Sequence, residues 1–222
     1  MNEKKHWERI AQAIMMKFLM YMPATKRKAS RYFKKHGSKN NTAIDFGCGN
    51  GKSFPYLAPI FKHVLGLDIS KGLLKQAKQR GYSNVALKKA DLTKKRLTLT
   101  QVDFAFCCNV IMFPDLEKNY TMLANINKAL KPGGAALVVL PSLDSALFSS
   151  WRLIDLYRKE GVDVNDIPAH EFHYFKGTKR DLIQGIVHID GVPTKHYSQT
   201  ELQVTFEEAG FKITALERLE YD

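Results

Sequence analysis

The 222-residue sequence predicts an α/β fold with a mostly parallel sheet that is covered by helices on both faces. Two observations predict it. Five short, largely apolar segments have the character of buried strands, and stretches with helical spacing or helix signals separate them. Parallel neighbours need such crossover connections, whereas hairpins would join antiparallel ones. The predicted strands are residues 42–46, 63–68, 84–87, 102–108 and 135–140.

Helix signals occur before the first predicted strand and between the later ones. Residues 10–22 predict an amphipathic N-terminal helix, because polar residues interrupt the apolar run and no small-residue cleavage site follows it. Ser70 is a good N-cap for a helix that Gly81 ends. Apolar residues recur at helical spacing over 115–131, and Pro132-Gly133-Gly134 stops that helix.

The regular alternation stops after the fifth predicted strand. Residues 141–197 are long, polar and aromatic, with a predicted hairpin at 186–197 around an Asp-Gly turn. A capping box at 198–201 then opens a helix that ends at Gly210, and residues 211–219 predict a sixth strand. Ligands of open α/β sheets bind at the carboxyl ends of the strands, so this insertion is expected to be a lid over a substrate pocket.

Composition and charge exclude several classes. With 45% hydrophobic and 25% charged residues the chain is not disordered, and no apolar run is long enough to predict a membrane span. Three cysteines make no disulfide framework, which favours a cytoplasmic location. Residues 1–100 hold 22 Lys and Arg against 5 Asp and Glu, whereas residues 101–222 hold 12 against 17. The basic half is either a solubilising surface or a face for nucleic acid, anionic membrane or acidic substrate.

A glycine-rich turn is the main functional signal. Gly47, Gly49 and Gly51 directly follow a buried strand, and their bare backbone allows close approach of a ligand. Asp68 ends the next strand, where a carboxylate can accept both hydroxyls of a ribose. The alternative for Asp68 is an N-cap, although Ser70 already fills that role. Asp91 follows the third strand and suits either an adenine amino group or a plain turn.

Together these pieces resemble the class I S-adenosylmethionine-dependent methyltransferase family. The matching segments are residues 43–51, 65–69, 90–92, 104–110, 130–134 and 207–211. The resemblance implies a doubly wound, Rossmann-like sheet of seven strands, with N-terminal helices and an insertion after the fifth strand. It also implies S-adenosylmethionine as the cofactor. The cofactor-binding residues that it implies are Asp45, Phe46, Gly47, Cys48 and Gly49 at the methionine end, Asp68 and Ile69 at the ribose, Asp91 and Leu92 at the adenine, and Asn109 and Val110 beside the sulfonium.

A nicotinamide-binding dehydrogenase is the main competitor. Its fingerprint, G-x-G-x-x-G, places the third glycine one residue later, where this chain has Lys52. Among methyltransferases, those that act on base amines resemble one another in two prolines after the fourth strand, which are missing here. Cys107 and Cys108 lie within an apolar strand and are expected to pack in the core or line the cofactor wall. No catalytic residue is therefore assigned.

The insertion contains the residues that we predict to bind the methyl acceptor. His170, His173, Tyr174 and His196 are candidate substrate-binding residues, with lid packing as the alternative. Their spacing does not predict a metal site. We expect one methyltransferase domain over residues 1–222, with a cap at 1–40, a core at 42–140, a lid at 141–197 and a closing segment at 198–222. It is expected to methylate an O or N nucleophile of a small molecule as a monomer or homodimer. The alternatives are RNA or protein methylation through the basic half, or non-catalytic cofactor binding.

Overall fold

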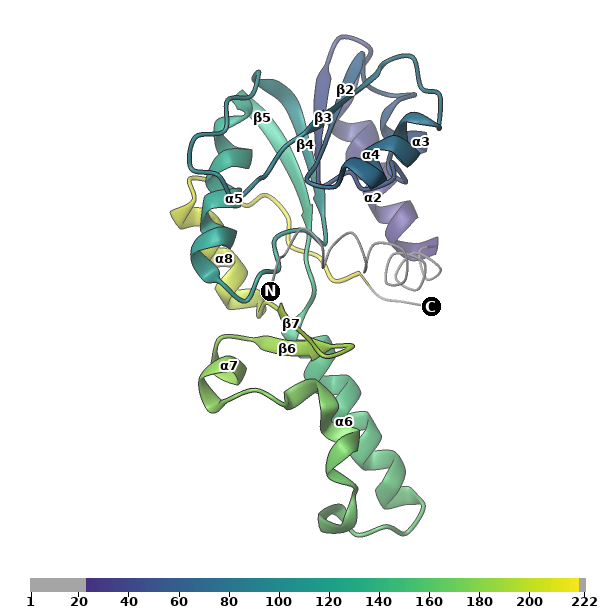
Figure 1. Ribbon diagram of the computed structural model, residues 1–222, viewed down its shortest axis with the longest axis vertical. Coiled ribbons are helices and arrows are strands. Elements are labelled where there is room, and N and C mark those ends of the chain that lie inside the picture. Colours follow the sequence, from purple (N-terminus) through teal and green to yellow (C-terminus); the bar gives the residue numbers. More distant parts are fainter. Residues whose placement is uncertain (1–22, 220–222) are drawn as a thin grey trace. The chain divides into compact units, whose positions relative to one another are not determined.

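The computed structural model describes residues 23–219, which form two compact units (Figure 1). Unit 1 comprises the described residues up to Cys108 together with Thr121–Val139 and the segment from Thr214. Unit 2 comprises Asn109–Tyr120 and Leu140–Ile213. The helix expected at residues 10–22, and with it most of the expected cap, lies outside the described residues.

Unit 1 is built on a parallel sheet of five strands in the order β3-β2-β1-β4-β5. The bounds are β1 Thr42–Phe46, β2 His63–Asp68, β3 Val85–Lys89, β4 Val102–Cys108 and β5 Leu130–Val139. Strand β1 lies in the middle, and the chain returns to its other side between β3 and β4. This is the doubly wound α/β fold that the alternation of strands and helices predicts.

The helices of unit 1 lie toward both sides of the sheet in Figure 1. They are α2 Pro23–His36, α3 Phe54–Leu57, α4 Lys71–Lys78 and the later part of α5 Leu116–Lys128. The side chain of Ser70 caps α4 by accepting from the Leu73 amide, and Gly81 follows that helix with a φ of 73°. Both helix signals of the sequence are therefore confirmed.

An aromatic cluster fills the space between α2, α3 and the sheet. The ring of Phe33 meets Phe104 and Phe106 edge-on, and Phe61 stacks on Phe104 at a centroid distance of 5.3 Å. Leu57 and Val64 are buried in the same cluster. Offset and edge-to-face ring pairs add to the stabilisation from area burial, so this cluster fixes the strands that carry the glycine turn.

Unit 2 contains α6 Leu143–Lys159, two short 3₁₀ segments (η1 Val164–Asp166 and η2 Ala169–Phe175), α7 Lys179–Ile183, β6 Ile186–Ile189, β7 Val192–Lys195 and α8 Gln199–Glu208. The hairpin of β6 and β7 is confirmed, with positive φ at both turn residues, Asp190 and Gly191. The helix after Ser198 is confirmed as α8, and the Ser198 side chain caps it.

Three expectations need correction. The polar insertion begins with a 17-residue helix, α6, none of whose residues is buried; sequence reasoning missed it because α6 has no single buried apolar face. Strand β5 begins at Leu130 and runs through Pro132-Gly133-Gly134, with a register shift opposite Val102 and Phe104.

Residues 211–219 form no strand, so the expected sixth strand is wrong, and the expected seven-stranded sheet has five strands among the described residues. That segment is held instead by side chains. The carboxylate of Glu217 accepts from Arg31 at 2.6 Å and from the Tyr32 hydroxyl at 2.7 Å. Within residues 23–219, no helix is long and apolar enough to cross a membrane.

Candidate cofactor-binding site

The glycine turn closes on the end of β2. The amides of Gly47 and Cys48 both donate to the carbonyl of Leu67 at 2.8 Å, and the Gly51 amide donates to the Cys48 carbonyl at 2.9 Å. Gly47, Gly49 and Gly51 have φ values of 75°, 55° and 76°. Side chains rarely tolerate this backbone region, so the turn requires three glycines and presents bare peptide groups.

Asp68 joins this turn to the end of β2. One carboxylate oxygen accepts from the Gly49 amide at 2.9 Å, and the other accepts from the Ser70 amide at 2.8 Å. Burial raises the pKa of Asp68, while the amide hydrogen bonds oppose that rise. A carboxylate has about four acceptor positions, so it retains capacity for hydroxyl donors. Asp68 does not cap α4, because Ser70 does.

Asp45 is a buried carboxylate that has no cation as a partner within residues 23–219. It lies on β1 with 2% of its surface exposed, and the Ser53 hydroxyl donates to it. Burial raises its pKa to about 7, and the charge of Asp68 adds to the rise. The neighbouring Cys48 thiol is also buried, which raises its pKa strongly and keeps it protonated. Phe46, the next residue of β1, is core.

Sequence reasoning missed Gly66, which makes room beneath the turn. A Cβ at Gly66 would lie 2.9 Å from Cys48 Sγ, from the Phe54 ring and from a Leu87 methyl group. Any larger residue at position 66 would displace the turn. Its signal in the sequence was a glycine within an apolar strand, which often marks close packing.

Arg80 is a second missed residue. Its Nε donates to the carbonyl of Asn50 at 2.5 Å, and its Cδ lies 3.1 Å from where a Gly51 Cβ would be. The side chain therefore holds the glycine turn from the loop that follows α4. No local pattern predicts this contact, because 30 residues separate the partners.

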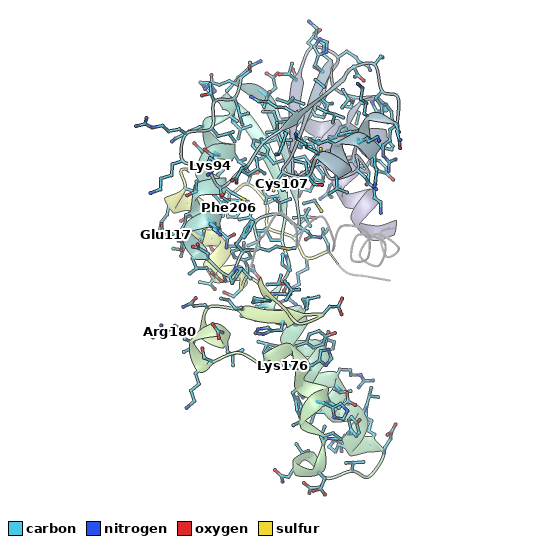
Figure 2. The ribbon with its side chains drawn as sticks, viewed as in Figure 1. Lys94, Cys107, Glu117, Lys176, Arg180 and Phe206 are labelled. Carbon is cyan, nitrogen blue, oxygen red and sulfur yellow. The ribbon has the colours of Figure 1, made fainter. Side chains whose placement is uncertain are left out.

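The loop after β3 places Asp91 and Leu92. The Asp91 carboxylate accepts from the amide and hydroxyl of Thr93 at 3.0 and 2.6 Å, an Asx turn. Leu92 is buried, and Asn125 of α5 donates to the carbonyls of Leu92 and Lys94, both at 2.9 Å. Figure 2 shows Lys94 in this loop. The loop is fixed, although part of the Asp91 carboxylate is already used.

The fourth strand ends in Cys107 and Cys108. Cys107, labelled in Figure 2, is 1% exposed, and burial raises the pKa of Cys108 to about 12. Both are thiols in packed surroundings, as expected. Asn109 and Val110 follow directly and begin unit 2; Asn109 has a φ of 54°, which asparagine tolerates better than most residues. Ile69 follows Asp68 at the end of β2 and is half-buried.

The candidate acceptor residues all belong to unit 2, in two different environments. His170 and His173 are exposed on η2, where the rings of His173 and Tyr174 lie 4.1 Å apart. His196 is buried, its Nδ1 lies 3.0 Å from the Thr194 carbonyl, and burial lowers its pKa. A neutral ring that donates from Nδ1 keeps Nε2 as an acceptor. No cluster able to hold a metal ion occurs among the described residues.

The chain is similar in sequence to known methyltransferases. Residues 43–134 match the family model of a methyltransferase domain. The chain is 28% identical over 130 residues to the methyltransferase AacuQ of Aspergillus aculeatus, covering 58% of this chain and 40% of that protein. It is 37% identical over 111 residues to protein 235L of Invertebrate iridescent virus 6, which is provisionally named a methyltransferase, covering 49% and 40%. It thus spans about 40% of the length of these relatives.

A solved structure shares the fold. The S-adenosylmethionine-dependent methyltransferase from Mesorhizobium loti superposes with a TM-score of 0.62 at 19% identity, covering 88% of this chain and 84% of that one. The family match spans β1 to the Pro-Gly-Gly turn in β5, which includes the glycine turn, Asp68 and Asp91. Residues 43–134 are therefore similar to methyltransferase domains, and the fold is that of a solved methyltransferase.

Proposed function

We propose that this protein transfers a methyl group from S-adenosylmethionine to an O or N nucleophile of a small molecule. One observation carries the cofactor assignment: Asp68 ends β2 with its carboxylate on the Gly49 amide, so the ribose acceptor and the glycine turn form one unit. The methyltransferase family match over residues 43–134 and the described dependence of the Mesorhizobium protein on this cofactor support it.

The residues of unit 1 fit this cofactor chemically. The turn has three glycines at positive φ, so its peptide groups are accessible to the amino-acid end of the cofactor. Asp68 retains acceptor capacity for the two ribose hydroxyls, and the loop of Asp91 and Leu92 would lie along the adenine. When bound, S-adenosylmethionine supplies a methyl group that its sulfonium already activates.

The protein's own contribution is alignment and exclusion of water. Holding a nucleophile in line with the methyl group can contribute roughly 7–11 kcal/mol through effective concentration. A base is needed only when the nucleophile carries a proton at working pH. Burial lowers the pKa of His196, which favours the neutral ring, and His170 and His173 are exposed. These three side chains, with Tyr174, are the proposed acceptor contacts.

A small acceptor is favoured by how unit 2 is attached. Its two segments leave the sheet after Cys108 and Val139, which are the carboxyl ends of β4 and β5. In open α/β folds these ends border the ligand site. Long insertions of this kind are often functional and bind substrate, which supports a small molecule as the acceptor.

Calorimetric titration with S-adenosylhomocysteine tests the proposal. We expect the intact chain to bind, and Asp68→Ala to lose about 100-fold in affinity or more, because two hydrogen bonds to a carboxylate are removed. Glu208→Ala, which removes an exposed carboxylate at the end of α8, serves as control and should bind like the original chain. Absence of binding to folded protein would refute the proposal, and binding of NADH instead would favour a dehydrogenase.

RNA is the second candidate acceptor because of the surface charge of residues 69–102. Nine exposed cations occur there with one carboxylate, Asp91. They are Lys71, Lys75, Lys78, Arg80, Lys88, Lys89, Lys94, Lys95 and Arg96. Binding to an RNA duplex that weakens steeply between about 50 and 200 mM salt would favour this alternative. Binding that does not depend on salt would exclude it.

A further inference from the structure

Helix α6 of unit 2 has two different faces (Figure 1). On one face, Tyr157 is half-buried, and its hydroxyl donates to Glu171 of η2 at 2.9 Å. On another face lie Leu147, Phe148 and Trp151, which are 44, 62 and 55% exposed. Residues three and four apart share one side of a helix, so these three form a continuous apolar stripe, the outer face of α6. The rings of Phe148 and Trp151 lie 5.7 Å apart within it.

Two charged residues flank the outer face symmetrically. Trp151 is the middle residue of the 17-residue helix, and Asp144 and Arg158 each lie seven residues from it. Seven residues are about two helical turns, so both charges lie on the same side of α6 as Trp151. Both residues are exposed. Arg158 donates to Asp155 at 3.1 Å, and because a guanidinium has five N–H donors, it retains donors for a second carboxylate.

This arrangement of charges makes the outer face complementary to an antiparallel copy of itself. When two copies of α6 meet with Trp151 at a two-fold axis, Asp144 of one copy lies opposite the partner's Arg158, and the same pair forms at the other end. A two-fold interface requires such self-complementarity, because the same surface is used by both subunits. Asp155, on the same side of the helix, already forms ion pairs with three cations of α6.

We propose that two copies of this chain associate through the outer face of α6, antiparallel about a two-fold axis at Trp151. Contiguous exposed apolar side chains mark interaction sites, and Trp and Arg are the residue types that dominate binding energy at protein interfaces. The exposed parts of the three apolar side chains amount to roughly 300 Å² per copy, less than the roughly 800 Å² per partner of a standard interface. The dimer is therefore weak and depends on concentration. This inference does not depend on the proposed function.

Sedimentation velocity of the full chain tests the association. The dimer fraction should rise between about 1 and 100 μM protein. Trp151→Ser should weaken association about tenfold or more, with no loss of Tm, because the side chain is exposed in the single chain. Leu156→Ser is the matched control, since Leu156 is 46% exposed on another side of the same helix, and it should associate like the original chain. A chain that stays monomeric throughout, or equal weakening by the two variants, would overturn the proposal.

Charge reversal tests the antiparallel orientation. Asp144→Lys and Arg158→Glu each place like charges opposite one another in the homodimer, so each variant alone should associate about threefold less tightly or worse. An equimolar mixture of the two variants should recover association, because opposite charges then meet at both ends of the mixed dimer. Failure of the mixture to recover would overturn the proposed pairing.

Fluorescence of Trp151 identifies what covers the outer face. The sequence has two Trp residues, so Trp7→Phe leaves Trp151 as the single emitter. Its emission maximum should move to shorter wavelength as protein concentration rises, because the ring leaves water in the dimer. If the chain stays monomeric and the shift requires vesicles of phosphatidylcholine with phosphatidylserine, the outer face binds a membrane surface and the proposal is overturned.

Discussion

Both units bury an ionisable side chain, and they treat it in opposite ways. In unit 1, Asp45 is 2% exposed, and among the described residues its partner is the Ser53 hydroxyl and no cation. In unit 2, Lys195 is fully buried and forms an ion pair with both carboxylate oxygens of Glu201, at 2.6 and 2.7 Å. Its Nζ also donates to the His196 carbonyl and lies 4.4 Å from the centre of the Tyr197 ring.

The difference distinguishes a ligand-binding region, around Asp45, from a structural contact, the ion pair of Lys195 with Glu201. A buried charge with a full set of partners organises its surroundings, and Lys195 joins the hairpin to α8. A buried carboxylate without a cation reduces stability, and such groups concentrate where a ligand is bound. On this comparison the glycine turn is arranged for a ligand, whereas the end of β7 is arranged for stability.

The largest expected effect is that Asp45→Asn stabilises the protein. The pKa of Asp45 is about 7 in the folded chain, above the ordinary 3.8, so stability is lost as the pH rises from about 4 to about 7. Asparagine still accepts from Ser53 and removes that loss. We expect a gain on the order of 3–4 kcal/mol at pH 8 that disappears near pH 4, measured by urea unfolding at several pH values. A gain in stability that does not change with pH would show that ionisation of Asp45 does not destabilise unit 1, and the contrast with Lys195 would fail.

Removing the carboxylate partner of Lys195 should destabilise the protein, opposite to the effect of Asp45→Asn. Glu201→Ala leaves a buried ammonium without its carboxylate and should cost about 3 kcal/mol in the free energy of unfolding. The double variant Lys195→Met with Glu201→Leu should recover most of that loss, because no charge remains buried. Glu208→Ala, on the same helix and exposed, should change stability by less than about 0.5 kcal/mol. If Glu201→Ala behaves like Glu208→Ala, the ion pair does not organise unit 2.

A packing variant separates steric from electrostatic effects in unit 1. Gly66→Ala places a Cβ 2.9 Å from three neighbouring atoms and should cost about 1–3 kcal/mol at every pH. Gly72→Ala is the matched control on α4, where the nearest atom is 3.7 Å away. It should stabilise the protein by about 0.5 kcal/mol through helix propensity. Calorimetric Tm values of both variants at two pH values would reveal any pH dependence, which is not expected.

The smallest expected effect is at Asp103, an aspartate of unit 1 that has a cation. Lys131 lies 2.8 Å from its carboxylate, which also accepts from Thr42, so the pKa of Asp103 is lowered. The contribution to stability is present at neutral pH and is lost as the pH falls through the lowered pKa. Asp103→Asn should cost less than about 1 kcal/mol at pH 7 and nothing at the lowest pH at which the chain stays folded. Urea titrations would show whether its pH dependence is opposite in sign to that of Asp45→Asn.

The parallel sheet and the glycine turn could be predicted because their causes are local. Apolar runs of strand length, Ser70 as a cap and glycines at positive φ each act within a few residues of the chain. Helix α6 was missed because it has no buried face, and helical periodicity is informative only when one face is buried. The strand expected at 211–219 was wrong, because the segment pairs with no strand of the sheet; Glu217 contacts Arg31 and Tyr32 instead.

Sequence alone determined the order of the strands along the chain, the turn that follows β1 and the acidic residue at the end of β2, since backbone conformation and strand ends depend on near neighbours. Tertiary structure decided which groups meet: Asp68 with the Gly49 amide, Arg80 with the Asn50 carbonyl, Gly66 beneath Cys48, and Lys195 with Glu201. It also decided which face of α6 stays exposed. Burial and hydrogen-bond satisfaction depend on residues distant in the sequence, and no local pattern encodes them.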